Sequence, residues 1–137
     1  MYRFQRLPHP ADIRIKIEAD SLEELFKGAL KVLEEILEPD NYQKKKNLIF
    51  EEEINLTSYD LTSLLIDFLN QVLALSEIKK AIFSEIIFKK LSENEFSGII
   101  KGYPVKKFST GIKAVTYYQA EIIKNNNLYQ TIIVFDI

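Results

Sequence analysis

The chain has no cysteine, no tryptophan, one histidine and only four glycines among its 137 residues. Without cysteine, a disulfide framework, a thiolate zinc site and a cysteine nucleophile are excluded, and a reducing compartment is favoured. We therefore expect the protein in the cytoplasm. The glycines are scattered, so no glycine-rich phosphate cradle exists. The single histidine, His9, lacks an evident partner for general-base chemistry and is interpreted as an ordered loop residue.

Charge of one sign is also not in excess. Eighteen Lys and Arg stand against 20 Asp and Glu, for a net charge of -2, which is too balanced for strong attraction to nucleic acid or to an anionic membrane. The lysines at 44–46 and 106–107 could contact phosphate locally, although solvated loops are the favoured interpretation. No signal peptide is evident, and no stretch looks long enough to span a bilayer.

The first half of the chain predicts a strand, a helix, a strand and a second helix. Apolar and polar residues alternate over 11–19, the pattern of a strand with one buried face. Ser21 and Glu24 form a capping box for a helix that Pro39 ends at about Glu38. A weaker strand is expected over 48–56, and a central helix over 61–75, with Thr57 or Asp60 as its cap.

The second half predicts strands. The segments 82–91 and 96–103 flank a polar turn and form a hairpin, followed by a loop over 101–111. The segments 112–124 and 128–136 form a second hairpin around three asparagines, Asn125 to Asn127. With 47% hydrophobic residues and no linker, residues 1–137 form one α+β domain. In it, two helices pack on a mainly antiparallel or mixed sheet.

The chain ends within an apolar strand, at Asp136 and Ile137. Two anionic groups therefore stand side by side, the Asp136 side chain and the terminal carboxylate of Ile137, and Asp12 is a third candidate from the polar face of the first long strand. Three clustered carboxylates repel one another unless a cation lies between them. An oxygen-only cluster favours calcium, magnesium or manganese over zinc or copper. The alternative is that the strand ends at the surface and water solvates these groups.

A lysine is expected beside these carboxylates if the last hairpin has a two-residue turn. With Asn125 and Asn126 as that turn, Val115 faces Asp136, and Lys113 lies diagonally from Asp136 on the same face. The interaction is then either a plain salt bridge or a positioned cation beside an anionic site. A three-residue turn would shift the register and remove the pairing.

Four motifs in order resemble the archease family over nearly the full length. They are 9–12 (His-Pro-Ala-Asp) followed by 21–26 (Ser-Leu-Glu-Glu-Leu-Phe), 60–70 (Asp-Leu-Thr-Ser-Leu-Leu-Ile-Asp-Phe-Leu-Asn), 112–117 (Ile-Lys-Ala-Val-Thr-Tyr) and 134–137 (Val-Phe-Asp-Ile). The chain departs from the family in the 102–111 loop, which is several residues short and lacks the family's histidine. The resemblance implies an archease-like fold.

The resemblance further implies an accessory protein rather than an enzyme. Archeases serve the RtcB-type RNA ligase of tRNA splicing, promoting its GTP-dependent guanylylation and its multiple turnover. The family's calcium site falls here on Asp12, Asp136 and Ile137, and its functionally needed lysine falls on Lys113. A partner ligase is therefore expected, and neither a membrane nor strong direct binding of nucleic acid is.

Two other classes of function stay open from the sequence. One is a regulatory domain that buries a small molecule, for which a retained metabolite would be diagnostic. The other is a metal-dependent hydrolase, in which Asp12 and Asp136 hold a cation that activates water. The hydrolase would need His9 as its base, so a His9→Ala substitution would inactivate it.

Overall fold

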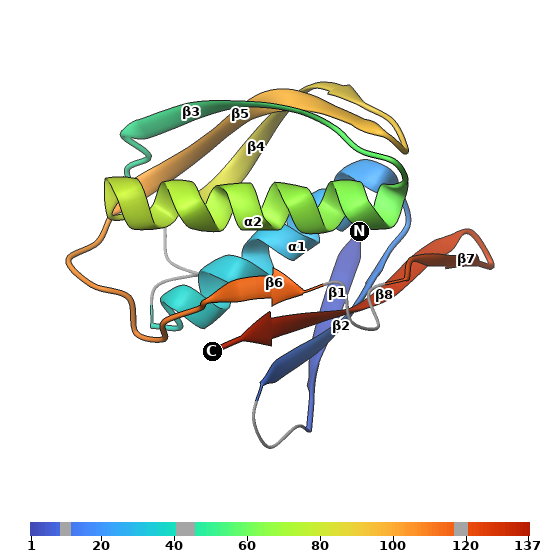
Figure 1. Cartoon of the computed structure of the whole chain (residues 1–137), viewed down its shortest axis with the longest axis horizontal. Coiled ribbons are helices and arrows are strands. Elements are labelled where there is room, and N and C mark those ends of the chain that lie inside the picture. Colours follow the sequence, from blue (N-terminus) through green and yellow to red (C-terminus); the bar gives the residue numbers. More distant parts are fainter. Residues whose placement is uncertain (9–11, 41–45, 117–120) are drawn as a thin grey trace.

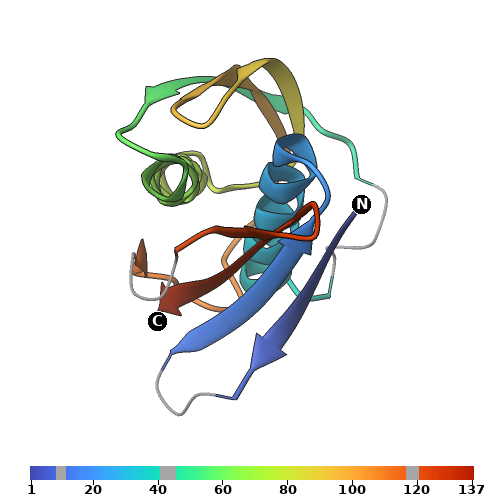
Figure 2. The same ribbon diagram turned by 90° about the vertical axis from the view of Figure 1, so that its right-hand side faces the viewer.

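Two antiparallel sheets enclose a layer of two helices (Figure 1). The structure is a computed structural model, and it describes residues 1–8, 12–40, 46–116 and 121–137. In chain order the elements are β1 (Tyr2–Leu7), β2 (Ile13–Ala19), α1 (Leu22–Leu37), β3 (Phe50–Thr57), α2 (Leu61–Lys79), β4 (Ala81–Leu91), β5 (Glu95–Pro104), β6 (Ala114–Thr116), β7 (Ile123–Asn125) and β8 (Leu128–Asp136). The α+β class is confirmed. The strands, expected in one sheet, form two, and Figure 2 shows both helices between them.

Sheet A, with strand order β1-β2-β8-β6 and β7 also paired to β8, forms one outer layer. The predicted alternation of β2 is confirmed, because Ile13, Ile15 and Ile17 are buried toward the helices while the residues between them are half-buried on the outer face. Strand β1 was not predicted. It is an edge strand with a largely exposed pattern, which leaves a weak periodicity in the sequence.

Helix α1 begins and ends as its sequence predicts. Ser21 is the N-cap, and its Oγ accepts a hydrogen bond from the Glu24 N–H at 3.1 Å. The helix closes at Leu37, with Glu38 as the C-cap just before Pro39. The buried side chains of α1 pack against β2 on one side and β4 on the other, so this helix joins the two sheets.

Helix α2 is longer than predicted and runs to Lys79. Asp60 caps it by accepting from the Ser63 N–H at 2.8 Å, whereas Thr57 belongs to β3. By length and composition α2 meets the minimum for crossing a bilayer, which corrects the expectation that no stretch does. The apolar composition of α2 is explained by its position between the two sheets. A buried core helix meets the same criterion of length and hydropathy as a membrane-spanning helix.

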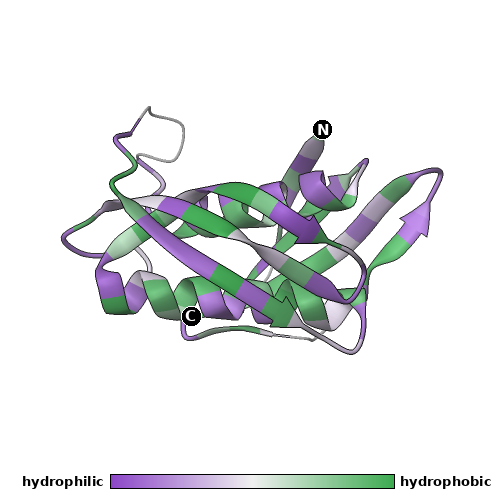
Figure 3. Cartoon of the chain, turned by 90° about the horizontal axis from the view of Figure 1, so that it is seen from above, coloured by the Kyte–Doolittle hydropathy of each residue, from purple (hydrophilic) through white to green (hydrophobic). Residues whose placement is uncertain are grey.

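Sheet B, with strand order β3-β5-β4, forms the other outer layer and is bent over the helices. The pairing of β4 with β5 skips one residue at Ser84 and again at Lys89, and glycines of β5, Gly102 and Gly98, stand beside these two bulges. A side chain at either glycine would collide with a carbonyl oxygen of β4. The bulges therefore require glycine opposite them and curve the sheet. Figure 3 shows hydrophilic and hydrophobic residues alternating along its strands.

The last hairpin is confirmed in its location and wrong in its register. The turn lies at Asn126 and Asn127, with φ of 52° and 65°, and Asn125 pairs with Leu128. Both central residues therefore have the left-handed conformation of a type I′ turn, which asparagine tolerates. Where one strand was expected over 112–124, the described residues form two short strands, β6 and β7.

Candidate functional site

Three strand ends meet at one end of sheet A. Ile13 at the start of β2 pairs with Phe135 of β8, and Ala114 at the start of β6 pairs with Asp136. Because these pairs are antiparallel, extending the first register by one residue places Asp12 across from Asp136. Strand β8 lies between β2 and β6, so the end of β8 has one partner strand on each side.

The site's carboxylates are accessible from solvent. Asp12 and Asp136 are half-buried, and Ile137 is 41% exposed. The fold thus brings the three predicted anionic residues to neighbouring positions on two adjacent strand ends. Asp12 also has an interaction of its own with the chain, so its carboxylate is not without a partner.

Lys113 reaches this end of the sheet through its main chain. Its N–H donates to the carbonyl oxygen of Asp136 at 2.7 Å, and its side chain is exposed. The expected pairing of Val115 with Asp136 is wrong, because Ala114 faces Asp136 and Val115 faces Phe135. Lys113 therefore does not occupy the diagonal position on the face of Asp136.

The register differs because β6 and β7 pair with β8 at different offsets. Paired numbers sum to 253 between β7 and β8 (Asn125 with Leu128) and to 250 between β6 and β8 (Ala114 with Asp136). From Ile123 back to Thr116 the chain takes seven steps, while their partners on β8, Gln130 and Val134, are four apart. A single uninterrupted hairpin, on which the expected pairing depended, does not form.

Asn70 of α2 holds β6 in place and was not predicted as a site-forming residue. Its Nδ2 donates to the Val115 carbonyl oxygen and its Oδ1 accepts from the Val115 N–H, both at 2.8 Å. The side chain thus occupies the position that another strand would take along the free edge of β6. A polar residue within the apolar stripe of the central helix is the sequence signal for this contact.

The donor set fits a hard divalent cation only if the chain terminus takes part. Within the described ranges, no group of three or more His, Cys, Asp or Glu side chains is gathered so that it could hold a metal ion. Asp12 and Asp136 supply two side-chain carboxylates, and the terminal carboxylate of Ile137 is the third oxygen donor group at this end of the sheet. All three are hard oxygen ligands, which suit calcium or magnesium.

His9, the only candidate base for a hydrolase, lies outside the described residues, as do Lys44 and Lys45 of the first lysine cluster. Its position relative to Asp12 and Asp136 is therefore not part of the site described above.

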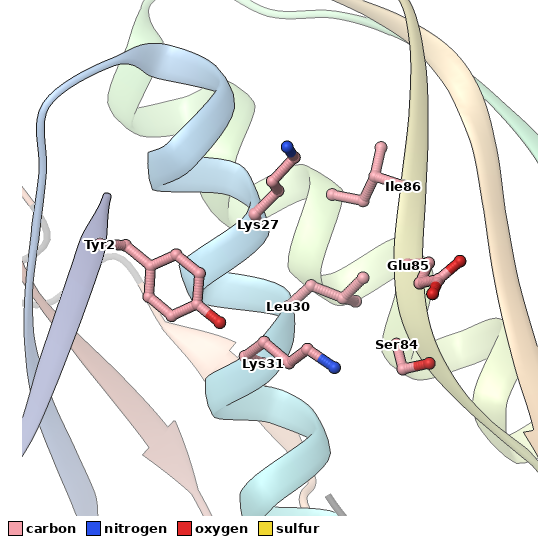
Figure 4. Close-up of a pocket in the computed structure, with 7 residues that line it drawn as sticks. All are labelled: Tyr2, Lys27, Leu30, Lys31, Ser84, Glu85 and Ile86. Carbon is pink, nitrogen blue, oxygen red and sulfur yellow. The ribbon is translucent and has the colours of Figure 1, made fainter. Parts of the chain in front are cut away.

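A separate groove of about 320 Å³ lies between β1, α1 and β4 (Figure 4). Tyr2, Leu30 and Ser84 line it together with Lys27 and Lys31, so its walls are partly polar. None of the residues of the carboxylate site lines this groove. A small molecule bound here would therefore lie apart from the carboxylates.

A buried acidic side chain of α1, Glu34, has a structural role. The carboxylate of Glu34 is buried, yet it is 3.1 Å from the Lys31 ammonium and accepts the Tyr103 hydroxyl at 2.7 Å. Burial and the neighbouring Glu34 raise the pKa of the Tyr103 phenol above its usual range. The phenol therefore stays protonated and donates to Glu34, which ties β5 to α1.

Comparisons with known proteins point to one family. The sequence matches the model of the Archease protein family (MTH1598/TM1083) over residues 4–137. Proteins called archease from Methanosarcina mazei and Methanosarcina barkeri are 33% and 34% identical, and each comparison covers 98% of this chain and 96% of the relative.

Two solved structures share the fold. The solution structure of protein 1598 from Methanobacterium thermoautotrophicum has a TM-score of 0.76 and 23% identity, covering 98% of both chains. The crystal structure of an archease from Thermotoga maritima, described as a possible chaperone, has a TM-score of 0.68 and 25% identity, covering 97% of this chain and 96% of that one. Both helices and both antiparallel sheets thus belong to an architecture that recurs in these proteins.

Proposed function

Because this chain belongs to the archease family, we propose that it is the accessory protein of an RtcB-type RNA ligase in tRNA splicing, working in the cytoplasm. Such a ligase joins a 3′-phosphate or 2′,3′-cyclic phosphate to a 5′-hydroxyl. The chain itself is not the ligase. Its task is to promote GTP-dependent guanylylation of the ligase and to let the ligase turn over repeatedly.

The observation that carries this proposal is the meeting of Asp12, Asp136 and Lys113 at one end of sheet A. Asp136 is paired with Ala114, Asp12 directly precedes the paired residue Ile13, and the Lys113 N–H donates to the Asp136 carbonyl. The site therefore stands on ordered strands rather than on a free tail. A charged group held in this way can orient a phosphate or a metal ion on a partner at little entropic cost.

The carboxylates of Asp12 and Asp136 and the terminus of Ile137 would hold a hard cation, with calcium as the first candidate. When bound, such a cation offsets the repulsion among the carboxylates and offers a positive charge to phosphate oxygens. Lys113 contributes a second positive charge, because its main chain is hydrogen-bonded to Asp136 and its side chain is exposed. Docked at the nucleotide pocket of the ligase, these residues would position GTP for attack by the ligase histidine.

The proposal is tested by measuring guanylylated ligase after mixing the purified protein, an RtcB-type ligase and labelled GTP. The wild type should raise the yield, and Asp12→Ala or Lys113→Ala should lower the rate about tenfold, the effect of losing roughly 1.4 kcal/mol of stabilisation. Asp20→Ala and Lys89→Ala are matched controls, because Asp20 directly follows β2 at its opposite end and Lys89 lies on β4 of sheet B. An unstimulated ligase, or equal stimulation by wild type and Asp12→Ala, rejects the proposal.

A further inference from the structure

The connection between β5 and β6, residues 105–113, leads from the end of α2 to the carboxylate site. Three main-chain hydrogen bonds fasten it: Val105 N–H to the Lys80 carbonyl at 3.0 Å, Ser109 N–H to Leu37 at 2.9 Å, and Lys113 N–H to Asp136 at 2.7 Å. Figure 1 shows it as the orange segment that ends beside the C-terminus. The connection is therefore attached to both helices and to sheet A.

The apolar residues of this connection anchor it to the core. Ile112 is 3% exposed, and Val105 and Phe108 pack against the hydrophobic core while partly buried. Its exposed positions, in contrast, are taken by lysine, serine and glycine. Because the backbone of the connection is held by hydrogen bonds and buried side chains, the exposed charged side chains extend from fixed main-chain positions.

Four lysines share this region, and we call them the lysine band: Lys80, Lys106, Lys107 and Lys113. All four are exposed, and none of their ammonium groups has an ion pair or hydrogen bond within the part of the chain that the structure describes. The neighbouring Lys79, by comparison, is paired with Glu52 at 3.3 Å. The carboxylate of Glu38 in α1's C-cap accepts the Ser109 hydroxyl at 3.3 Å. The four ammonium groups of the band therefore have no direct ion-pair partner among the described residues.

We propose that the lysine band binds the phosphodiester backbone of single-stranded RNA along the connection that leads to sheet A. Lysine ammonium groups on flexible stems bind phosphate as point charges, and a series of them suits a chain of phosphates. The choice of RNA, rather than another polyanion, rests on the proposed function.

The chemistry of the band favours a phosphate chain over an acidic protein surface. Protein interfaces have apolar or aromatic residues at their centre and are depleted of lysine there. Along residues 105–113 the apolar side chains pack inward, and Phe108 is partly buried, so the connection offers no exposed aromatic ring on which a base could stack. Binding should therefore be weak, independent of base sequence and sensitive to salt. This agrees with the net charge of -2, which opposes tight binding of RNA by the whole chain.

The test is fluorescence anisotropy with the protein alone and a labelled, unstructured single-stranded RNA at several salt concentrations. A Lys106→Gln/Lys107→Gln variant should bind about fivefold more weakly or worse, and its plot of log affinity against log salt should be flatter by about 1.4, or about 0.7 for each lost phosphate contact. The control is Lys27→Gln/Lys89→Gln, which removes the same two charges at exposed positions on α1 and β4. Both variants should unfold like the wild type in urea.

Saturable binding at low salt that the band variant loses and the control retains supports the proposal. Equal loss in the two variants would mean that only net charge matters, and it would overturn the proposal. An RNA affinity of the band variant equal to that of the wild type would also overturn it. If a separate measurement then showed weaker binding of that variant to the ligase, the band would face an acidic protein surface instead. The RNA measurement itself contains no ligase and leaves Lys113 intact, so a failure of the guanylylation test does not affect its result.

Discussion

The carboxamide of Asn70 pairs with the main chain of Val115 in both directions, donating to its carbonyl and accepting from its N–H at 2.8 Å each. Strand β6 has β8 on one side. On its other side this single side chain from α2 supplies the hydrogen bonds of a missing strand. The start of β6, and with it the contact of Lys113 with Asp136, is therefore set by a residue of the central helix.

Replacing Asn70 with leucine should destabilise the protein by about 1–3 kcal/mol, because both main-chain groups of Val115 lose a partner in a half-buried place. Urea unfolding measures that cost. Hydrogen exchange should show faster exchange of the Val115 amide. The control is Gln71→Leu, since the neighbouring Gln71 side chain has no hydrogen bond within the described ranges. If the two substitutions behave alike, Asn70 does not position β6.

Stability should fall at alkaline pH because of Tyr103. Burial and the Glu34 carboxylate raise the pKa of its phenol in the folded state above the ordinary value of 10.0. The protonated phenol therefore contributes fully below pH about 10, and its contribution is lost as the pH rises past that value, because the unfolded chain then releases the proton more readily. Urea unfolding from pH 8 to pH 11 should show this decline.

The matched variant for that experiment is Tyr103→Phe. It should cost about 1–3 kcal/mol near neutral pH, since the buried Glu34 loses a hydrogen bond while keeping Lys31. Its stability should also decline less between pH 9 and pH 11 than that of the wild type. Equal alkaline declines in both proteins would assign the effect to other tyrosines.

Gly28→Ala should destabilise the protein, although alanine favours a helix by up to about 1 kcal/mol over glycine. The added methyl group would lie 2.7 Å from Cγ of Tyr2 and 2.9 Å from Cδ1 of Ile17, so the Tyr2 ring on β1 and the end of the Ile17 side chain would have to shift. A net cost of about 1–3 kcal/mol is expected for such overpacking. In a Tyr2→Ala background the cost should be smaller, and a double-mutant cycle in urea measures the difference.

Calcium should stabilise the folded protein, and a C-terminal extension of a few residues should abolish that effect by moving the terminal carboxylate away from Asp136. Ligand at a hundred times its dissociation constant adds about 2.7 kcal/mol to the free energy of unfolding, which a chelator would remove. Thermal unfolding with calcium or with a chelator measures this. The same tag at the N-terminus and an Asp40→Asn variant are controls. A calcium effect that survives both the extension and Asp136→Asn would place the ion elsewhere.

The sequence contained enough to predict the helices and most strands. Ser21, Asp60 and Pro39 each act through local chemistry, so the helix ends they mark are readable without the fold. Strand β1 is an edge strand with one partner, and its half-exposed residues leave no strong period. The division into two sheets depends on which strands pair, and the alternation within a single strand does not encode that.

The sequence indicated that charged residues gather at one end of the last strand, but it did not give the register of the strand beside them. Asp12 and Asp136 are predicted because charged residues stand at the ends of apolar strands, whereas Lys113 depends on the expected register of the last hairpin and on the family resemblance. The offset between β6 and β7 is set at a distance, by Asn70 holding Val115 and by Thr62, whose hydroxyl accepts the Ile122 N–H at 3.1 Å. Such contacts join residues 45 and 60 positions apart, beyond the range of turn rules.

The bulges at Ser84 and Lys89 also affect association between separate molecules. Strand β4 is the outermost strand of its sheet, so its unpaired flank could recruit an identical chain and start a stack of copies. The irregular residues at these two places interrupt that flank, leaving no long straight row of donors and acceptors for an intruding strand to match. The two bulges that curve sheet B over the helices thus also hinder aggregation of the protein through its edge strand β4.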